Sequence, residues 1–555
     1  MQLAHIAEDG RQQTVQEHLE NTAELAEKFA DAFDAGKTGY AAGLLHDIGK
    51  YSEEFQKRIR GSSMQVDHST AGSQLAFSKN LLPAAFSIAG HHGGIPDGGS
   101  QNDSADNPTL LGRIKKQINP YDAWKQEIEI PEVHMPEWIL KSRDYFEVSF
   151  FIRMIYSCLV DADFLDTEAF MDGKQPRGGY ESLQQLLDKL RRKMEPWLCG
   201  KPANTLNEKR SDILRTCMNN GHIFQRGLYT LTVPTGGGKT TASLAFALEH
   251  GAAQGMERVI YVIPYTSIID QTVDVFNNIL GEENILAHHS EAGFLKKEKE
   301  DLTDLEYRSL LASENWDAPV VVTTAVQFFE SLFSNKNSRC RKIHNIADSV
   351  IIFDEAQTLP VSYLKPCIAA IAQLVKYYKA TVVLCTATQP SFDRLFRDYG
   401  LYAKEIYPDS SKIYSCLRRT KLKDAGVVSK GSLAELIRNE RQVLCVVNRR
   451  KTAQDIFYEL NEEGSYCLTT LLCAEDRKNK LDEIRQRLKQ GLDCRVISTS
   501  LIEAGVDVDF PVAYREEAGL DSFIQTAGRC NREGKISDSE KCPVYLFAIE
   551  VDYSQ

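Results

Sequence analysis

A glycine-rich loop near the middle of the chain restricts the fold more than any other segment. It reads Thr232-Val233-Pro234-Thr235-Gly236-Gly237-Gly238-Lys239-Thr240 and closes the apolar run 227–233. In such a loop, consecutive backbone N–H groups converge on phosphate oxygens, a lysine reaches the β and γ phosphates, and a hydroxyl binds Mg²⁺. The loop departs from the strict G-x-x-x-x-G-K-T form, because Val233 occupies the first glycine position. The segment predicts a strand, a phosphate-binding turn and a helix, with ATP and Mg²⁺ as ligands.

Short apolar runs, each followed by a helical pattern, begin with the run that leads into this loop and continue towards the end of the chain. The first set comprises 227–233, 258–263, 320–323, 350–353 and 381–385. The second set comprises 442–447, 495–498 and 544–549. Buried parallel strands that alternate with helices form a doubly wound α/β sheet, with its ligand site at the carboxyl ends of the strands. The pattern predicts two such α/β domains.

The part of the chain before residue 200 has a helical pattern instead. Val15, Leu19, Ala26, Phe29 and Phe33 follow a 3.6-residue period. A second helix is expected to carry Tyr40, Leu44, Leu45 and Ile48. Residues 93–136 are rich in turn-forming residues and predict a loop, after which helices resume at Ser142 and run to about Pro196.

The length and composition limit the class of protein. A chain of 555 residues is too long for one core, since domains hold roughly 100 to 200 residues each. We therefore expect an all-α domain at 1–200 and α/β domains at 201–395 and 396–555. The N-terminus has no apolar signal region, and no apolar stretch reaches the roughly 18 residues of a membrane span. The expected location is the cytoplasm.

Charge and cysteine usage exclude two further classes of protein. The formal charge of −12 argues against non-specific binding to nucleic acid through overall charge, but it does not exclude a local basic groove. The thirteen cysteines form no C-x-x-C pair. Most lie in apolar runs, so we interpret them as buried thiols and not as zinc ligands or disulfides.

Two further segments add the groups that ATP hydrolysis needs. The apolar run 350–353 leads into Asp354-Glu355-Ala356-Gln357. There Asp354 is placed to hold Mg²⁺ and Glu355 to orient or deprotonate the attacking water. Arg529 and Arg532, within 525–532, are expected on one helical face as arginine fingers that reach a γ phosphate held by the other domain. In isolation, 354–357 would be interpreted as a solvent-exposed helix start, and Arg529 and Arg532 as a surface ion pair. The buried strand before 354 argues against the first interpretation, and the presence of the other motifs in this chain argues against the second.

Taken in order, these motifs resemble those of a superfamily 2 helicase with two RecA-like domains. Tyr265-Thr266-Ser267 and 323–327 resemble first-domain segments that follow a nucleic-acid backbone, and Thr386-Ala387-Thr388 closes another strand. Segments 498–500 and 503–507 resemble the second-domain segment that couples ATP to strand contact. The resemblance implies nucleic-acid contacts at Thr266, Thr323, Thr324, Gln327 and Thr499. It implies further nucleotide contacts at Gln357, Asp507 and Gln525.

The helical part holds candidate metal ligands. Six of the twelve histidines lie before residue 93. A lone histidine is usually a satisfied core or surface residue, but so many in one segment point to a metal site. Imidazole and carboxylate suit Mn, Fe, Co, Ni or Zn, and this set is large enough for two ions about 3.5 to 4 Å apart. The candidate ligands are His18, His46, Asp47, His68, His91, His92 and Asp163.

Helical spacing separates the acidic candidates near residue 160. Ile152, Ile155, Leu159 and Asp163 follow steps of three and four residues, which puts Asp163 on an apolar face. An unpaired charge there would be costly, and metal ligation removes the cost. Asp161 is the second choice and Asp166 the third. His5 and His134 are expected at the surface.

The order of a histidine, His46-Asp47, His91-His92-Gly93 and Asp163 resembles the HD phosphohydrolase superfamily. The motif 46–50 with 67–69 is similar to its nuclease branch. An HD nuclease ahead of a superfamily 2 motor resembles the CRISPR-associated helicase-nuclease of type I systems. That family implies a single-stranded DNA nuclease with two divalent transition metals, fed by a 3′ to 5′ ATP-driven translocase.

The same resemblance implies recruitment to an R-loop by an RNA-guided surveillance complex. Lys50 is then a helper on the charge that develops during cleavage. Family members usually carry a further C-terminal domain, and this sequence ends at Gln555, after a strand of the second motor domain. The expectation is that this domain is missing here.

Two other functions fit parts of the sequence. One is an HD nucleotide phosphohydrolase with a regulatory ATPase, and the segments 323–327 and 498–507 count against it. The other is an ATP-driven remodelling translocase with a structural HD domain, and the complete set of candidate ligands counts against it. The oligomeric state is open.

Overall fold

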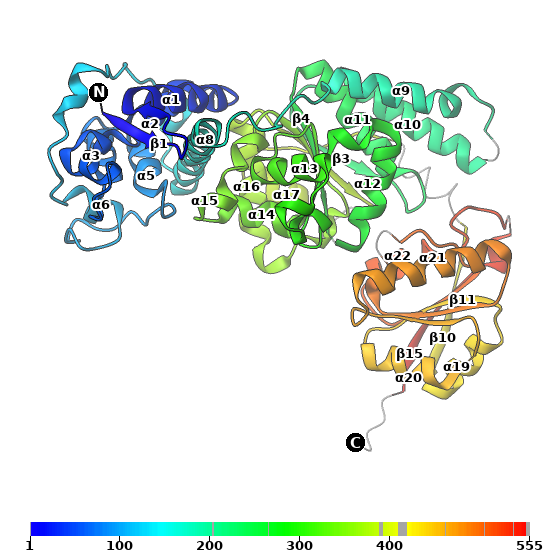
Figure 1. Cartoon of the computed structure of the whole chain (residues 1–555). Coiled ribbons are helices and arrows are strands. Elements are labelled where there is room, and N and C mark those ends of the chain that lie inside the picture. The colour runs from blue at the N-terminus through cyan, green and yellow to red at the C-terminus, as the bar shows by residue number, and fades with distance from the viewer. Residues whose placement is uncertain are drawn as a thin grey trace.

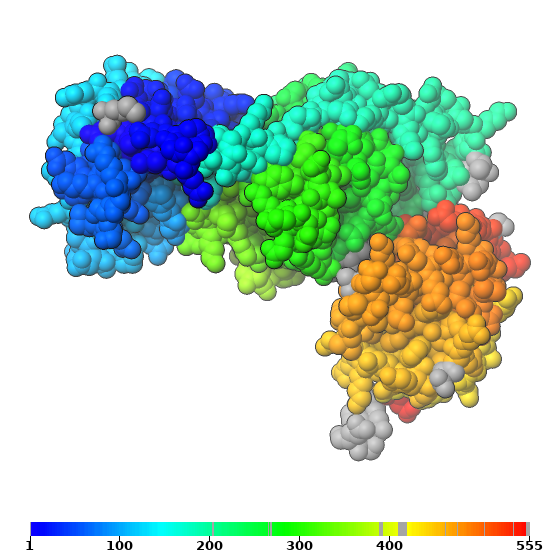
Figure 2. All heavy atoms as spheres, viewed as in Figure 1, coloured from blue at the N-terminus to red at the C-terminus, as the bar shows by residue number. Residues whose placement is uncertain are grey.

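The computed structural model describes residues 2–202, 205–264, 266–387, 392–408, 419–460, 462–503, 506–536 and 538–550. A helical part comes first, a central sheet with its helices follows, and a second sheet comes last (Figure 1). The helical part and the second sheet contact different sides of the central part (Figure 2). Among the described helices, none is both long and apolar enough to cross a membrane.

The helical part is built around α1 and α8. Thr14 and Glu17 form a capping box that starts α1, with the Thr14 hydroxyl accepting from Glu17 N. α1 packs against α2 and α8, and α4 packs against α5. The bounds are α1 Val15–Asp31, α2 Gly36–Leu45, α3 Glu53–Ile59, α4 Ser69–Ser78, α5 Leu82–Gly90 and α8 Tyr145–Met171. The predicted helical class is confirmed for this part.

The structure departs from the helical prediction in details that matter for the site. A hairpin of β1 (Leu3–Ile6) and β2 (Gln12–Thr14) precedes α1. α2 ends at Leu45, so the predicted second helix is too long, and Ile48 lies in the short 3-10 turn η1 (Ile48–Tyr51). In that turn a Cβ at Gly49 would lie 2.2 Å from His68 O. The turn therefore brings the residues after α2 against the start of α4.

The loop predicted for 93–136 contains two short helical segments. They are α6 (Leu110–Ile114) and η2 (Asp122–Gln126). A third short helix, α7 (Glu137–Lys141), precedes the predicted restart at Ser142, and the long helix α8 begins at Tyr145.

The central domain is a parallel sheet in the order β5-β6-β4-β7-β8-β3-β9. Its strands are β3 Leu228–Thr232, β4 Arg258–Ile263, β5 Ile285–His288, β6 Val320–Thr324, β7 Ser349–Phe353, β8 Thr381–Thr386 and β9 Lys404–Glu405. Helices around it include α11 Lys239–Gln254, α12 Thr266–Leu280, α13 Asp304–Asn315, α14 Ala325–Phe333 and α16 Leu364–Tyr377. All five predicted strands are present; β5 and β9 were missed.

The last domain is a second parallel sheet, in the order β10-β15-β14-β11-β13-β12. Its strands are β10 Lys421–Val428, β11 Gln442–Val446, β12 Ser465–Leu468, β13 Cys494–Ser498, β14 Val512–Glu516 and β15 Pro543–Ile549. Its helices include α19 Lys430–Arg438, α20 Arg450–Leu460, α21 Ala474–Gln490 and α22 Leu520–Ala527. The predicted α/β class is confirmed, but β10, β12 and β14 were missed. β10 and β12 are partly exposed and lack a continuous apolar run, and β14 is buried but ends in Arg515 and Glu516.

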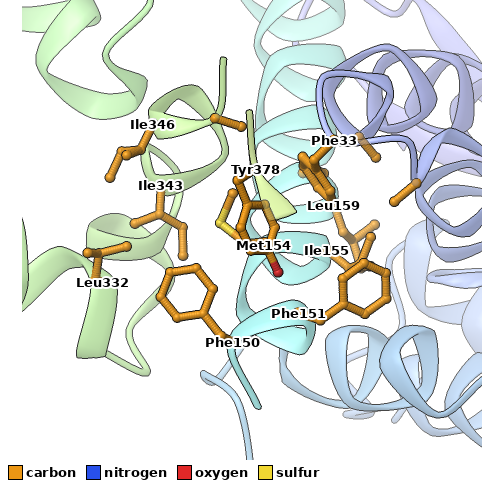
Figure 3. Close-up of a cluster of buried hydrophobic side chains, with 14 of the residues drawn as sticks. Phe33, Phe150, Phe151, Met154, Ile155, Leu159, Leu332, Ile343, Ile346 and Tyr378 are labelled. Atoms are coloured by element: carbon orange, nitrogen blue, oxygen red, sulfur yellow. The ribbon is translucent and has the colours of Figure 1, made fainter. Parts of the chain in front are cut away.

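One hydrophobic core joins the helical part to the central domain (Figure 3). Tyr378, which follows α16, packs against Phe33 and Phe150, with ring centroids 5.2 and 5.3 Å away. Met154 and Leu159 of α8 lie in the same cluster. The helical part is therefore fixed on the central domain by apolar packing.

The predicted boundaries at residues 200 and 395 stay predictions. α9 (Leu183–Cys199) packs against α11, and α10 (Thr205–Ile223) packs against the same helix. β9 pairs with β3 of the central sheet. We therefore propose that the first boundary lies near residue 180 and the second after residue 405.

Most described cysteines are buried, as predicted. Cys199 and Cys473 are exposed and Cys467 is half-buried, so for these three the prediction is wrong. All the described cysteines are free thiols.

Candidate metal and nucleotide sites

The seven predicted metal ligands converge at one place in the helical part, with His92 at its exposed edge. They come from the ends or inner faces of α1, α2, α4, α5 and α8. His46-Asp47 and His91-His92 occupy the turns in which α2 and α5 end. Their ligand atoms form two groups, each within 4.8 Å: one of His18, His46 and Asp163, and one of Asp47, His68, His91 and His92.

Asp47 belongs to the second group and also faces the first. Its Oδ2 lies 3.7 Å from His18 Nε2 and 3.6 Å from His46 Nε2. Its Oδ1 lies 3.2 Å from His91 Nε2 and 3.5 Å from His68 Nε2. Each carboxylate oxygen therefore faces a different set of imidazoles.

Hydrogen bonds at Nδ1 leave Nε2 of the buried histidines directed into the site. His46 Nδ1 donates to Gly43 O at 2.7 Å, and His91 Nδ1 donates to Ile88 O at 2.8 Å. His18 Nδ1 donates to Asp166 Oδ2 at 2.6 Å. Metal-binding histidines are held in this way, because the bond at one nitrogen fixes the tautomer of the other.

The inward-facing atoms fit a cation. His68 Nε2 lies 2.7 Å from His92 Nε2, and among the described residues His91 Nε2 and Asp47 Oδ1 are buried without a hydrogen-bond partner. Buried nitrogen lone pairs and carboxylate oxygens without partners are costly, and a divalent ion satisfies them together. The donor set of imidazole and carboxylate therefore fits a divalent metal.

Burial and neighbouring charges also shift the pKa values of the candidate ligands. Burial opposes the charged forms of the carboxylates, but Lys50 and His46 outweigh it and hold the pKa of Asp47 well below its usual range. Burial lowers the pKa of His92 to about 3 and also lowers that of His68. Burial acts against protonation of His46, yet Asp47 and Asp163 together raise its pKa. The carboxylates are thus ionised, and His68 and His92 are neutral, as metal ligands must be.

Two residues outside the predicted ligand set support the site. Lys50 Nζ lies 2.7 Å from Asp47 Oδ2 and donates to His5 Nε2 at 3.1 Å. The prediction that His5 is a surface residue is wrong, because β1 carries it inward against His18, with ring centroids 4.6 Å apart. Its pKa is lowered to about 4 by burial and then by Lys50. His134 is exposed, as expected.

Asp166 was ranked third among possible ligands and has a different role. It accepts hydrogen bonds from His18, Asn21 and Gln13. Its position three residues after Asp163 places both on one face of α8, which is the sequence signal for it. The second choice, Asp161, lies elsewhere and pairs with Arg341 at 2.9 Å.

The glycine-rich loop borders a cavity of about 530 Å³ between the two sheet domains. Gly236 and Gly238 have φ of +80° and +81°, which only glycine adopts readily. Gly237 N donates to Pro234 O and closes the turn. The cavity is lined by residues that include Thr235, Lys239, Thr240, Asp354, Glu355, Asp507, Arg529 and Arg532.

The acidic pair and the loop lysine already contact each other. Lys239 Nζ lies 2.6 Å from Glu355 Oε1 and 3.1 Å from Asp354 Oδ1. Gln357 donates to Glu355 Oε2 at 2.7 Å. Burial disfavours charge on Glu355, but Lys239 outweighs it and lowers the pKa of that carboxyl. The ammonium group of Lys239 and the carboxylates of Asp354 and Glu355 therefore lie together at the cavity.

Arg529 and Arg532 reach the cavity, but not from a helix. α22 ends at Ala527, so the prediction that they share a helical face is wrong. Arg529 is buried and donates to the carbonyls of Ile502 and Glu503 at 3.2 and 2.7 Å. Burial and then Arg532 lower its pKa to about 9. Gln525 lies in α22 and is not among the residues that line the cavity.

The predicted nucleic-acid residues of the central domain lie at or shortly after the ends of two paired strands, β4 and β6, and Thr499 lies in the other sheet domain. Thr324 is the N-cap of α14 and accepts from Gln327 N, while Thr323 Oγ1 donates to His288 O. Thr266 starts α12, directly after β4, which pairs with β6. Thr499 follows β13 in the second sheet. Tyr265, Thr388, Ala504 and Gly505 lie outside the described residues.

Three families of known proteins match successive parts of the chain. The HD domain family matches residues 15–124, the DEAD/DEAH box helicase family matches 209–395, and the C-terminal family of the CRISPR-associated nuclease/helicase Cas3 matches 439–535. The CRISPR-associated nuclease/helicase Cas3 of Haloferax volcanii is 23% identical, over 88% of this chain and 70% of that protein. The chain belongs to the Cas3 nuclease/helicase family.

Solved structures of this family share the fold. The crystal structure of T. fusca Cas3-AMPPNP aligns with a TM-score of 0.68 and 16% identity, over 99% of this chain and 75% of that one. A CRISPR RNA-guided surveillance complex, pre-nicking, contains a chain that aligns with a TM-score of 0.60 and 16% identity, over 100% of this chain and 74% of that one. This Cas3 family member is a hydrolase in which an HD nuclease domain precedes a helicase with two RecA-like domains. The helicase family implies ATP and Mg²⁺, and the HD domain implies a divalent metal.

Proposed function

We propose that this Cas3 family member cleaves single-stranded DNA at a site of two divalent metals and feeds that site by ATP-driven 3′ to 5′ translocation. The observation that carries the proposal is the position of Asp47, whose two carboxylate oxygens face two different sets of candidate ligands. A carboxylate with one oxygen toward each group is suited to bridge two ions.

In this proposal each group of ligands holds one ion. His18, His46 and Asp163 would hold the first, and His68, His91 and His92 would hold the second, with Asp47 available to both. The pair supplies a nucleophile from water at neutral pH and charge stabilisation at the phosphate when bound. Mn, Fe, Co and Ni all suit this donor set. Lys50, whose Nζ lies 2.7 Å from Asp47 Oδ2, keeps that carboxylate oriented and offers a cation to the phosphate.

The motor site supports ATP hydrolysis in the cleft between the sheets. Thr235 to Thr240 would cradle the phosphates, Asp354 would hold Mg²⁺, and Glu355 would orient the attacking water. Arg529 and Arg532 come from the opposite domain and line the same cavity. Closure of the cleft on nucleotide would bring them to the γ phosphate.

The cellular role follows from the family. The substrate that we propose is the DNA strand displaced at an R-loop, delivered by an RNA-guided type I surveillance complex in antiviral defence. The fold shared with a chain of such a complex supports this partner. The contacts of Thr266, Thr323, Thr324, Gln327 and Thr499 with the strand belong to this proposal. The cytoplasmic location stays a prediction.

Circular single-stranded DNA tests the nuclease directly. The circle has no ends, so any product requires internal cleavage. With Mn²⁺, Co²⁺ or Ni²⁺, the wild-type protein is expected to linearise and then degrade it without ATP. Circles that stay intact with every metal, for the wild type and Asp47→Ala alike, would overturn the nuclease proposal and favour the remodelling translocase with a structural HD domain.

A further inference from the structure

The first motor domain contacts the backbone of two metal-ligand candidates. The segment Ser334–Asn337, which follows α14, lies against residues 91–95 of the helical part. Ile95 N donates to Asn335 O at 3.2 Å. Gly94 has a φ of +100°, and a Cβ there would lie 2.5 Å from Asn335 O, so only glycine permits this approach.

Asn337 makes the central contact of this interface. Its Nδ2 donates to His91 O at 2.8 Å and to His92 O at 3.2 Å. Both partners are carbonyl oxygens, so the orientation of the amide is determined: only the NH₂ end can face them. One side chain of the motor domain thus holds the main chain of two adjacent histidines, which belong to the second ligand group.

The segment that carries Asn337 is itself fixed to α8. Ser157 Oγ of α8 donates to Cys340 O at 2.5 Å, and Arg153 of the same helix donates to Ser334 O. α8 also carries Asp163 of the first ligand group. Asn337 therefore has a fixed position relative to both groups of ligands.

We propose that Asn337 is a positioning residue for the nuclease: by holding the carbonyls of His91 and His92, it sets their imidazoles for metal binding. The inference rests on the proposed nuclease function. The turn after α5 is short. Without Asn337, the carbonyl groups of His91 and His92 could reorient together with their peptide planes, and the direction of the two imidazoles would change with them. Histidine supports of this kind affect metal affinity although they do not touch the metal.

The position of α14 gives the contact a further consequence. α14 begins at the segment 323–327, proposed to contact DNA, and ends directly before the Asn337 segment. The same helix therefore joins the proposed DNA contacts to the segment that holds His91 and His92.

The test compares three variants in the full chain. Asn337→Ala removes both donated bonds, Asn337→Asp places an acceptor against two carbonyls, and Asn337→Gln restores a donor. Asn335→Ala is the matched control, because that side chain is exposed and the substitution keeps the carbonyl that Ile95 uses. The readouts are Mn²⁺ binding by electron paramagnetic resonance on metal-free protein, cleavage of circular single-stranded DNA against Mn²⁺ concentration, and DNA-stimulated ATPase.

For Asn337→Ala we expect Mn²⁺ binding and the Mn²⁺ midpoint of cleavage to weaken by about tenfold, within the range for residues that orient metal ligands. Most of the rate should return at saturating Mn²⁺. Asn337→Asp should lose more, Asn337→Gln should recover part of the loss, and the ATPase and Asn335→Ala should match the wild type.

Two results would overturn the inference. One is wild-type Mn²⁺ binding and cleavage in Asn337→Ala. The other is a parallel loss of ATPase, which would mean a general disturbance of the motor domain. A wild-type protein that neither binds Mn²⁺ nor cleaves the circles would instead overturn the proposed nuclease, so the two failures are distinguishable.

Discussion

The Nε2 atoms of His18 and His46 lie 3.2 Å apart in the buried interior of the helical part. The Nδ1 atoms of both rings are engaged, with Asp166 and with Gly43 O. Two imidazole lone pairs directed at each other at this distance repel, unless a cation or a proton lies between them. The pair is arranged to share a positive charge, and Asp47 and Asp163 supply the negative charge that retains it.

Replacing Asp47 removes the shared oxygen pair. We expect Asp47→Asn to lower cleavage of single-stranded DNA by at least about a hundredfold and to reduce bound Mn²⁺, since ligand loss disrupts both ions. Cleavage of circular DNA and calorimetric titration with Mn²⁺ measure this. Asp122→Asn is the control, because Asp122 pairs with Lys125 at the surface and belongs to neither ligand group. Equal losses in both variants would contradict the assignment.

Asp166 orients His18 without facing the metal groups. Asp166→Asn keeps an acceptor for His18 Nδ1 but removes the negative charge, so metal affinity is expected to fall about 10 to 100-fold. Saturating Mn²⁺ should restore most of the cleavage. A variant that remains inactive at every Mn²⁺ concentration would show that Asp166 does more than support His18.

Lys239→Ala should separate the two activities. The lysine lies between Asp354 and Glu355 in the cleft, far along the chain from the metal site. DNA-stimulated ATPase is expected to fall by at least about a hundredfold, because the phosphates lose their cation. ATP-independent cleavage of circular single-stranded DNA should stay at the wild-type rate, and Lys57→Ala, at an exposed lysine, should change neither.

Three buried histidines of the central domain predict loss of stability in mild acid. Burial lowers the pKa of His250 to about 4 and those of His288 and His344 to about 3. Their pKa in the unfolded chain is about 6.5, so below that pH the unfolded state binds protons that the folded state does not bind. The free energy of unfolding should drop between pH 7.5 and 5.5, by about 1 kcal/mol for each histidine.

Urea unfolding of the full chain at the two pH values measures this drop. His288 accepts a hydrogen bond from Trp316 Nε1 at 2.7 Å, which requires the neutral ring. The variant His288→Asn should therefore show a smaller pH dependence than the wild type. An unchanged dependence would exclude His288 as a contributor.

Tyr378 tests the core shared by the helical part and the central domain. Its hydroxyl is buried without a hydrogen-bond partner in the described chain. Tyr378→Phe should raise the free energy of unfolding by about 1 kcal/mol, since an unsatisfied polar group is removed. Tyr378→Ala should lower it by about 3 to 5 kcal/mol through the cavity that it leaves. Thermal unfolding that separates into two transitions in Tyr378→Ala would show that this core couples the two parts.

Much of the architecture could be predicted because its signals are local. The buried strands β3, β4, β6, β7 and β8 read as continuous apolar runs, and the glycines of the loop 234–240 can only serve a turn. Edge and half-exposed strands such as β10 and β12 carry no such run. The arginines at 529 and 532 were placed on a helix because spacing alone does not reveal where α22 ends.

By itself, the sequence determined which residue types are present for each chemistry and in what order: a phosphate loop, an acidic pair, and seven candidate metal ligands. Only the tertiary structure decided which atoms face each other. In the structure His5 accepts a hydrogen bond from Lys50, Asp166 accepts one from His18, and Asn337 of the motor domain donates to the carbonyls of His91 and His92. These contacts join residues distant along the chain, and such contacts form only when whole elements pack.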